Sequence, residues 1–578
     1  MDLVIDALYS LPTGILLPLA FAAMICLCRP SQGKLIRTLA LIGTLAPCIW
    51  FAFMAVIFKW TGNAADFFHI SWNWFPAAGI SLSFGADTIS MLLVGLTVLL
   101  GPICVLASYT AITERLRTYY CWLLILQGAM TGVFLARDMI LFYTFFEFTL
   151  VPLYILINLY GSTNRRAAAT KFFLYTFTGS LITLAGLVYV AVQYHAIHHT
   201  WTFDFRALQT TAQGMTLSEQ KWVFWALLAG FAIKVPLFPV HTWLPLAHTE
   251  APTAGSVILA GVLLKLGTYG IFRFALGFVP AACTTFAPTL AVLSIIGIVY
   301  AGLICWVQTD VKKLVAYSSV SHLGYCVLGL FALNGVGLSG SVLYMINHGL
   351  STGALFLLIG MVYERYHTRS LKEMGGLARV MPIWASFMVF FTMASVGLPG
   401  LNGFVSEIMC MLGAFQSDSH RWATEQAGHA GLLPGATPGE LGPWYALAAG
   451  TGVIVTAMYL LYMLGKIVWG PLHEPGGHGH GHDDGHASVL PKDLGAREIG
   501  ILLPLAALCL ALGLYPTPIL KALEPSTAAV AKAIQHSRDN PPPSGTAPAR
   551  ETAASENPKS EIPNPKSEVS ASQEGVSK

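Results

Sequence analysis

Apolar segments about as long as a membrane-spanning helix recur along most of the chain, with short polar connections between them. A helix that crosses a bilayer needs about 20 mostly apolar residues. Windows of that length predict about fourteen spans, which makes the fold class an all-α polytopic membrane protein. The predicted spans lie near residues 7–28, 36–58, 87–112, 118–136, 139–160, 170–194, 222–243, 253–278, 286–307, 313–333, 338–363, 381–413, 443–469 and 498–515. The segment at 381–413 is long enough to contain a break.

Lysine and arginine residues gather in alternate connections between these segments, and the other connections hold one or two each. The basic connections contain Arg29, Lys34, Arg37, Arg115, Arg117, Arg165, Arg166, Lys312, Lys313, Arg365, Arg369, Lys372 and Arg379. Loops on the cytoplasmic side of a membrane carry the excess of positive residues. The pattern therefore predicts a multi-pass protein whose two termini lie outside the cytoplasm.

The composition supports the membrane assignment. Of the 578 residues, 55% are hydrophobic and 11% are charged, whereas a soluble domain carries about 25% charged residues. The net charge of +3 is too small to suggest a nucleic-acid partner. The ten cysteines lack metal or Fe–S spacing, so we expect buried apolar side chains and no redox centre in this chain. The first residues, MDLVID, are acidic, and we expect no cleaved signal peptide.

Two polar segments differ from the rest. The tail at residues 535–578 is rich in Pro, Ser, Glu and Lys, a composition that predicts disorder. The loop at residues 471–497 contains five histidines among glycines. Such a tract can bind a metal ion, but a flexible solvated loop is the interpretation that we favour.

An internal repeat organises the long apolar region. TGSLITLAGLVY (178–189) and TGALFLLIGMVY (352–363) are identical at seven of twelve positions, with an offset of 174 residues. The same offset places Lys234 one residue from Glu407, and Glu147 one residue from His322. Inverted repeats are common in transporters and place their sites near the membrane midplane. The predicted domains are N-terminal helices (1–115), a first repeat (116–280), a second repeat (281–470) and a C-terminal helix with its flank (498–534).

The segment FAIKVPLFPVHTWLP, at residues 231–245, combines Lys234, His241 and three prolines in an apolar stretch. It is either a loop end or a broken helix that holds an ion-carrying site. The second repeat has its own breaker, SVGLPGLNGFVSE, which ends in Glu407. Interrupted hydrophobic segments at matching places of two repeats indicate an ion path. We therefore favour a broken helix, with His241 beside the break as a candidate site residue.

Several ionisable residues lie at the centres of predicted spans. Glu147 lies in DMILFYTFFEFTLVPLYILI, and a charge at a helix centre costs about 2.5–3.5 kcal/mol on insertion scales. Burial favours a neutral carboxyl on Glu147 and a neutral amine on Lys234, whereas proximity favours both charges. A change in their separation would therefore take up or release a proton. Lys265, His322 and His348 lie near the middle of later spans, and histidine can relay protons near neutral pH.

Structural roles stay open for the same residues. Glu147 and Lys234 are alternatively a static ion pair, and His348 alternatively bonds a helix carbonyl. Lys171 and Arg273 lie near span ends, where we expect their side chains to reach toward the interface.

Four motifs carry a resemblance to a known family. They are LFYTFFEFTLVPLYILI, KVPLFPVHTWLPLAHTEAPTAGSVILAGVLLKLGTYG, DVKKLVAYSSVSHLGY and INHGLSTGALFLLIGMVYER. Over most of residues 85–470 the chain resembles the antiporter-like membrane subunits of respiratory complex I, the proton-pumping NADH:quinone oxidoreductase. The glutamate at position 407 resembles the M branch of that family, because the related antiporter-like subunits carry lysine at this position. The His-rich loop, residues 416–442 and the tail depart from the family pattern without touching these motifs.

The resemblance implies a fold and a set of roles. The fold would be a bundle of fourteen helices with two inverted five-helix repeats and a broken helix in each. Glu147 and Lys234 would be the input pair, and Lys265 the central relay. His322 and His348 would connect onward to the output residue, the glutamate of the second breaker.

The resemblance also implies a reaction that is shared with other subunits. Electron transfer from NADH to quinone elsewhere would drive proton movement through this chain, and FMN, Fe–S clusters, NADH and quinone would bind partner subunits. The expected partners are other complex I membrane subunits, including the sibling antiporter-like subunits on either side, in the lipid bilayer of a bacterial inner membrane. The alternatives are a subunit of a multi-protein Na⁺/H⁺ antiporter, a subunit of a membrane-bound hydrogenase, and a structural membrane scaffold.

Overall fold

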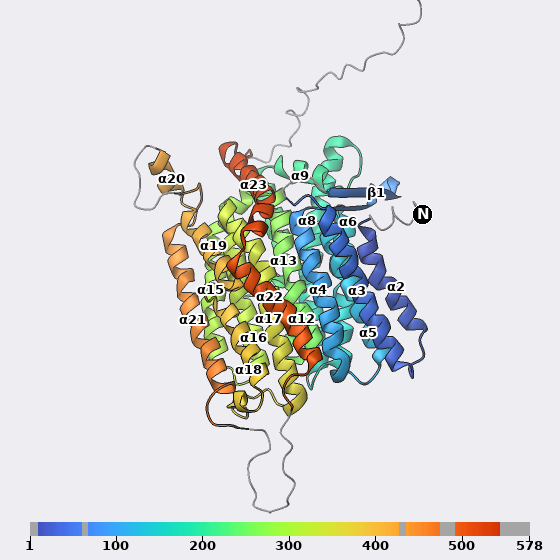
Figure 1. Ribbon diagram of the computed structural model, residues 1–578. Helices are drawn as coiled ribbons and strands as arrows, with labels where there is room; N and C mark the ends of the chain where they lie inside the picture. The colour runs from blue at the N-terminus through green and yellow to red at the C-terminus, as the bar shows by residue number, and fades with distance from the viewer. Residues whose placement is uncertain (1–9, 61–66, 427–434, 474–491, 544–578) are drawn as a thin grey trace, which may run out of the picture.

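The computed structural model is a bundle of long helices that lie side by side (Figure 1). It describes residues 10–60, 67–426, 435–473 and 492–543. The helices before residue 260 include α2 (Pro12–Leu27), α3 (Gly33–Ile57), α4 (Thr88–Ala111), α5 (Leu116–Leu135), α6 (Met139–Phe148), α7 (Leu150–Tyr160), α8 (Arg165–His198), α10 (Leu217–Lys234), α11 (Leu244–Glu250) and α12 (Thr253–Ile258). The later helices are α15 (Pro280–Trp306), α16 (Val311–Phe331), α17 (Gly335–Tyr366), α18 (Pro382–Val396), α19 (Asn402–Gln416), α21 (Pro443–Ile467) and α22 (Ala496–Leu514).

The all-α, multi-pass class predicted from the apolar windows is confirmed. Within the described ranges, eleven helices are long and apolar enough to cross a membrane, and α2 and α18 are shorter apolar helices. The window predicted at 222–243 is not among the eleven, because its helix, α10, begins with charged residues and ends early, at Lys234. The number of fourteen spans and the inverted repeats stay predictions.

The burial of the helices separates an interior from a lipid-facing surface. The most apolar windows of α17 and of residues 253–278 are 100% buried, and that of α16 is 94% buried, whereas those of α3 and α22 are each 33% buried. Apolar side chains such as Leu303 and Ile454 are exposed on the outer helices, as expected where lipid replaces water. The interior helices therefore hold their ionisable residues away from both water and lipid.

Several elements at one end of the bundle were not predicted. A two-stranded antiparallel hairpin pairs β1 (Phe67–Phe75) with β2 (Ile80–Ala86), in a segment rich in the aromatic residues that favour strands. The short helices α9 (Phe205–Gln213) and α20 (Ser419–Gln426) and the longer α23 (Thr517–Asp539) lie at the same end (Figure 1).

The predicted start of the disordered tail, residue 535, is wrong because it lies inside a helix. Helix α23 continues through Asp539, past the predicted start at 535, because its Ala-rich sequence favours a helix. The rest of the tail beyond residue 543, and residues 474–491 of the His-rich loop, lie outside the described residues.

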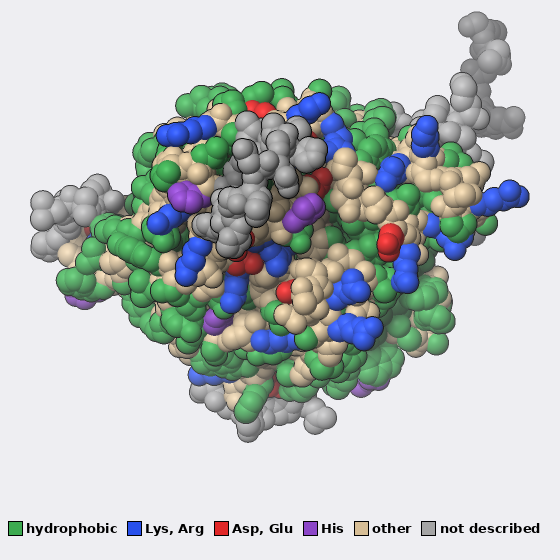
Figure 2. All heavy atoms as spheres, turned by 90° about the horizontal axis from the view of Figure 1, so that it is seen from below, with side chains coloured by type: hydrophobic (Ala, Val, Ile, Leu, Met, Phe, Trp, Pro, Cys, Tyr) green, Lys and Arg blue, Asp and Glu red, His purple; other side chains and the backbone are tan. Residues whose placement is uncertain are grey.

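The opposite end of the bundle is the basic one. Lysine and arginine side chains are numerous on this face (Figure 2). Among them, Arg365 at the end of α17 forms two hydrogen bonds of 2.9 and 2.8 Å with Glu498 at the start of α22. The asymmetry between the two ends follows the alternation of basic connections in the sequence.

Candidate functional site

Lys265 lies in the interior of an irregular helix. The segment runs from α12 through a π-helical turn, η2 (Leu259–Leu263), then α13 (Leu264–Gly270), a second π-helical turn, η3 (Ile271–Ala275), and α14 (Leu276–Phe278). π-Helical turns are frequent at functional sites because they disturb the regular hydrogen bonding of the helix. The Lys265 amine is fully buried and donates to the carbonyl of Ala260 in the first of these turns.

The same amine contacts a histidine of α17. Lys265 Nζ lies 2.8 Å from Nδ1 of His348 on α17, and both side chains are at most 1% exposed. Two of the candidate residues, Lys265 and His348, are therefore in direct contact. A buried amine and imidazole at hydrogen-bond distance can share a proton between them.

A second buried cluster joins three helices. Nδ1 of His322, on α16, lies 3.2 Å from Oε1 of Glu407, on α19. The hydroxyl of Tyr344, on α17, lies 2.7 Å from the same His322 nitrogen and donates to the same Glu407 oxygen. All three side chains are at most 3% exposed. Tyr344 was missed by the sequence analysis, although it precedes His348 by one helical turn.

The two clusters lie close together in the interior. The rings of His322 and His348 have centroids 5.9 Å apart. Nε2 of each ring is buried without a hydrogen-bond partner among the described residues. The four groups therefore form a nearly continuous series from Lys265 through the two histidines to Glu407.

The second broken helix is observed where the sequence predicts it. Helix α18 ends at Val396 and α19 begins at Asn402. The Asn347 amide of α17 donates to Asn402 O at 2.7 Å and to Ser406 Oγ at 3.0 Å, and the Asn402 amide donates to Asn347 O at 3.2 Å. These reciprocal hydrogen bonds connect the start of α19, the helix that carries Glu407, to α17, the helix that carries His348.

The first broken helix is also confirmed. Helix α10 ends at Lys234, and residues 235–243 are not helical. A Cβ placed on Gly267 of α13 would lie 2.8 Å from Lys234 Cβ, so glycine permits this close approach. The break therefore brings the backbone of Lys234 against the helix that carries Lys265.

Glu147 and Lys234 lie in the same region but are not an ion pair in this structure. Lys234 Nζ lies 3.4 Å from Oγ1 of Thr149 and 4.5 Å from the ring centre of Phe146. These residues flank Glu147 at the junction of α6 and α7. Glu147 Oε1 is buried and has no hydrogen-bond partner among the described residues. The static ion pair considered as an alternative is therefore not present here.

Two further histidines differ in their surroundings. His241 packs against Phe238 and Tyr300, with centroids 5.8 and 5.9 Å away, and the structure does not bond it to the other candidate residues. His248, on α11, was left out of the predicted set. It is fully buried and stacks on Phe356 of α17, with ring centroids 4.6 Å apart.

A cavity lies near His248 at the basic end of the bundle. Its volume is about 510 Å³, and its lining includes Glu250, Lys312 and Glu364. Glu250 follows His248 by two residues on α11. Lys312 Nζ donates to Ala251 O at 2.5 Å. The cavity therefore has a lining residue two positions from the buried histidine on α11.

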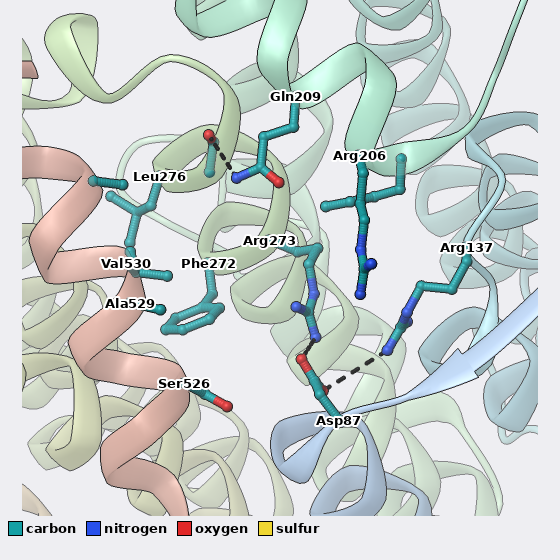
Figure 3. A pocket seen from close by; sticks show the side chains of 13 residues that line it. Asp87, Arg137, Arg206, Gln209, Phe272, Arg273, Leu276, Ser526, Ala529 and Val530 are labelled. Carbon is teal, nitrogen blue, oxygen red and sulfur yellow. Dashed lines mark hydrogen bonds and ion pairs between the residues drawn. The ribbon is translucent and has the colours of Figure 1, made fainter. Parts of the chain in front are cut away.

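A polar cluster at the hairpin end surrounds Asp87. The guanidinium of Arg273 pairs with its carboxylate, that of Arg137 lies 3.9 Å away, and that of Arg206 points toward them into a cavity of about 190 Å³ (Figure 3). Burial alone would raise the pKa of Asp87, but Arg273 and Arg137 outweigh it and hold that pKa well below its usual range. Arg273, which was expected to reach toward the interface, thus also forms a specific ion pair with Asp87.

Within the described residues, no group of three or more His, Cys, Asp or Glu side chains is arranged to hold a metal ion. All ten cysteines are free thiols, and eight of them are buried.

Comparison with known proteins gives the family. A transmembrane family described as NADH:quinone oxidoreductase/Mrp antiporter matches residues 136–426, which include every candidate residue from Glu147 to Glu407. The chain belongs to this family. A family member from Rhodobacter capsulatus, NADH-quinone oxidoreductase subunit M, is 40% identical over 455 residues, which cover 78% of this chain and 82% of the relative. The resemblance stated from the motifs is confirmed.

Solved structures of the family have the same fold. A chain of respiratory complex I from Thermus thermophilus with bound NADH has a TM-score of 0.76 and 29% identity, over 91% of this chain and 99% of that chain. A chain of the Mrp complex from a Dietzia species has a TM-score of 0.73 at 22% identity, with the same coverage. The second likeness shows the fold alone.

Proposed function

We propose that the chain is a proton-translocating membrane subunit of an NADH:quinone oxidoreductase. The observation that carries the proposal is the buried series Lys265, His348, His322 and Glu407, in which no side chain is more than 3% exposed. Ionisable side chains inside a membrane cost free energy of insertion, and they mark ion pathways. Four of them in one interior track provide successive positions for a proton.

Glu147 and Lys234 act as a switch at the beginning of this series. No ion pair joins the Lys234 amine to Glu147 in this structure, and burial favours the neutral amine. Approach of Glu147 would favour the charged amine again. A movement at the α6–α7 junction or at the break after α10 therefore changes how strongly Lys234 holds a proton.

The redox chemistry that drives this movement belongs to partner subunits. NADH, FMN, Fe–S clusters and quinone bind there, and this chain contributes no redox centre. The relatives named NADH-quinone oxidoreductase subunit M support the assignment to a complex of several subunits. Sibling antiporter-like subunits flank the chain in a bacterial inner membrane. The basic face lies toward the cytoplasm and the hairpin face, with both termini, lies outside, as the positive-inside rule requires.

The test measures NADH oxidation and proton uptake together in membrane vesicles that contain the assembled complex. Lys234→Ala and Glu407→Gln are expected to lower both rates, because each variant removes one position for the proton. The matched control is Lys466→Ala, which removes an exposed lysine from α21. Wild-type pumping in both relay variants, with normal assembly, would contradict the proposal.

The same vesicles distinguish the proposed function from a stand-alone Na⁺/H⁺ antiporter. A redox-driven subunit acidifies the vesicles when NADH is supplied, in the absence of any sodium gradient. An antiporter responds to an imposed sodium gradient without NADH. Proton movement that follows the sodium gradient alone would favour the antiporter.

A further inference from the structure

The Tyr344 hydroxyl occupies a position that the relay described above does not use. It lies between His322 of α16 and Glu407 of α19, and it contacts both. The ring is 3% exposed, so bulk water does not reach this junction. A phenol hydroxyl has one hydrogen to donate and two lone pairs that accept, and it can therefore bond to both neighbours at once.

The distances favour a path through this hydroxyl. The direct separation of His322 Nδ1 and Glu407 Oε1 is 3.2 Å, at the upper end of the usual range for a nitrogen–oxygen hydrogen bond. Nδ1 lies closer to the Tyr344 oxygen, at 2.7 Å. The hydroxyl also donates to the same Glu407 oxygen. The two-step route therefore consists of shorter contacts than the direct one.

We propose that Tyr344 carries the proton between His322 and Glu407. When His322 is protonated, its Nδ1–H bond breaks as a new O–H bond forms at Tyr344, while the original Tyr344 O–H bond breaks as one forms at Glu407 Oε1. An imidazolium and a carboxylate become an imidazole and a carboxylic acid, and the phenol keeps one hydrogen. Rotation of the hydroxyl from the histidine toward the glutamate then resets the step.

The neighbours of Tyr344 continue the path. Tyr344 and His348 are one helical turn apart on α17 and so share a face of that helix, with ring centroids 6.4 Å apart. His348 in turn contacts Lys265. This inference rests on the proposed function, because it assigns a role within the same relay.

The test removes one oxygen atom, that of the Tyr344 hydroxyl. Tyr344→Phe keeps the ring and removes the hydroxyl, and proton pumping by the assembled complex is expected to fall about 100-fold, which is within the range for loss of a proton-transfer group. The matched control is Tyr325→Phe on α16. The Tyr325 hydroxyl is equally buried but donates only to a backbone carbonyl, that of Ala449, at 2.9 Å. Pumping in the control is expected within twofold of wild type.

A second substitution serves if Tyr344→Phe does not assemble. 3-Fluorotyrosine at position 344 preserves the shape and makes the hydroxyl more acidic, so it is expected to shift the pH profile of pumping, whereas the same change at position 325 is not. Wild-type pumping in Tyr344→Phe, or an unchanged pH profile with fluorotyrosine, would overturn the role of Tyr344. If Glu407→Gln abolishes pumping in the same experiment, only this inference fails; if Glu407→Gln also pumps normally, the proposed function fails as well.

Discussion

Gly267→Ala adds one methyl group where the break after α10 meets the helix that carries Lys265. The new Cβ would lie 2.8 Å from Lys234 Cβ, from the Phe231 carbonyl oxygen and from Val235 Cγ2. Two of these atoms belong to α10 and the third to the residue after it, so the end of α10 has to move as a unit. Lys234 would therefore be displaced relative to Lys265 without a change in either side chain.

The structure sets the size of this displacement. Ordinary van der Waals contact begins at 3.4 Å, so the end of α10 must move by about 0.6 Å. Overpacking of this kind costs about 1–3 kcal/mol of stability. Misplacement of reacting groups by about 1 Å can slow a reaction about 100-fold, so we expect a loss of about tenfold in coupled NADH oxidation and pumping.

The assay is NADH-driven proton uptake by vesicles that contain the assembled variant, with thermal unfolding measured in parallel. Gly450→Ala is the matched control, because a Cβ at Gly450 of α21 meets nothing within 4 Å. We expect the control to pump normally and to be as stable as wild type or slightly more stable, since alanine favours a helix. Normal pumping and normal stability in Gly267→Ala would refute the claim that this contact positions Lys234.

Two further changes test the supports of the site. Asp87→Asn leaves the Arg273 and Arg137 guanidiniums without their carboxylate and is expected to destabilise the complex by about 3 kcal/mol, the lower end for a broken buried pair, as measured by thermal unfolding. Because the folded-state pKa of Asp87 is depressed, its contribution to the free energy of unfolding is fully present above its unfolded pKa of about 3.9 and is lost as the pH falls below that value. If the difference in stability between Asp87→Asn and wild type instead disappeared between pH 8 and 6, that result would contradict this assignment. Asn402→Ala removes one side of the amide pair at the second break and is expected to lower stability by about 1–3 kcal/mol and to slow pumping because Glu407 loses its fixed position; unchanged rates in vesicles would argue against that support.

The sequence predicted those features of the fold that depend only on the residues of a single segment, such as broken helices and membrane-spanning helices. The clusters of proline and glycine in these two segments predicted both broken helices, since the interior of a helix disfavours both residue types. The apolar windows located Lys265 and His348 in membrane-spanning helices, because length and polarity are local properties. The resemblance placed these two residues in one relay, and the structure shows that they are in direct contact.

Other features depend on how helices are rotated against one another. Tyr344 is an ordinary tyrosine in the sequence, and only the packing of α16, α17 and α19 places its hydroxyl between His322 and Glu407. The separation of Glu147 from Lys234 likewise depends on the junction of α6 and α7, where Pro152 lies in the first turn of α7. The hairpin and α9 lie outside the apolar windows, so a search for spans passes over them.

Lys265 is the residue that any path from the first repeat to Glu407 must pass in this account. The decisive measurement is proton uptake together with NADH oxidation by Lys265→Met in the assembled complex, compared with Lys466→Met, which changes an exposed lysine. The account predicts that both rates fall together in Lys265→Met and stay normal in the control. Wild-type pumping by Lys265→Met would contradict the buried relay.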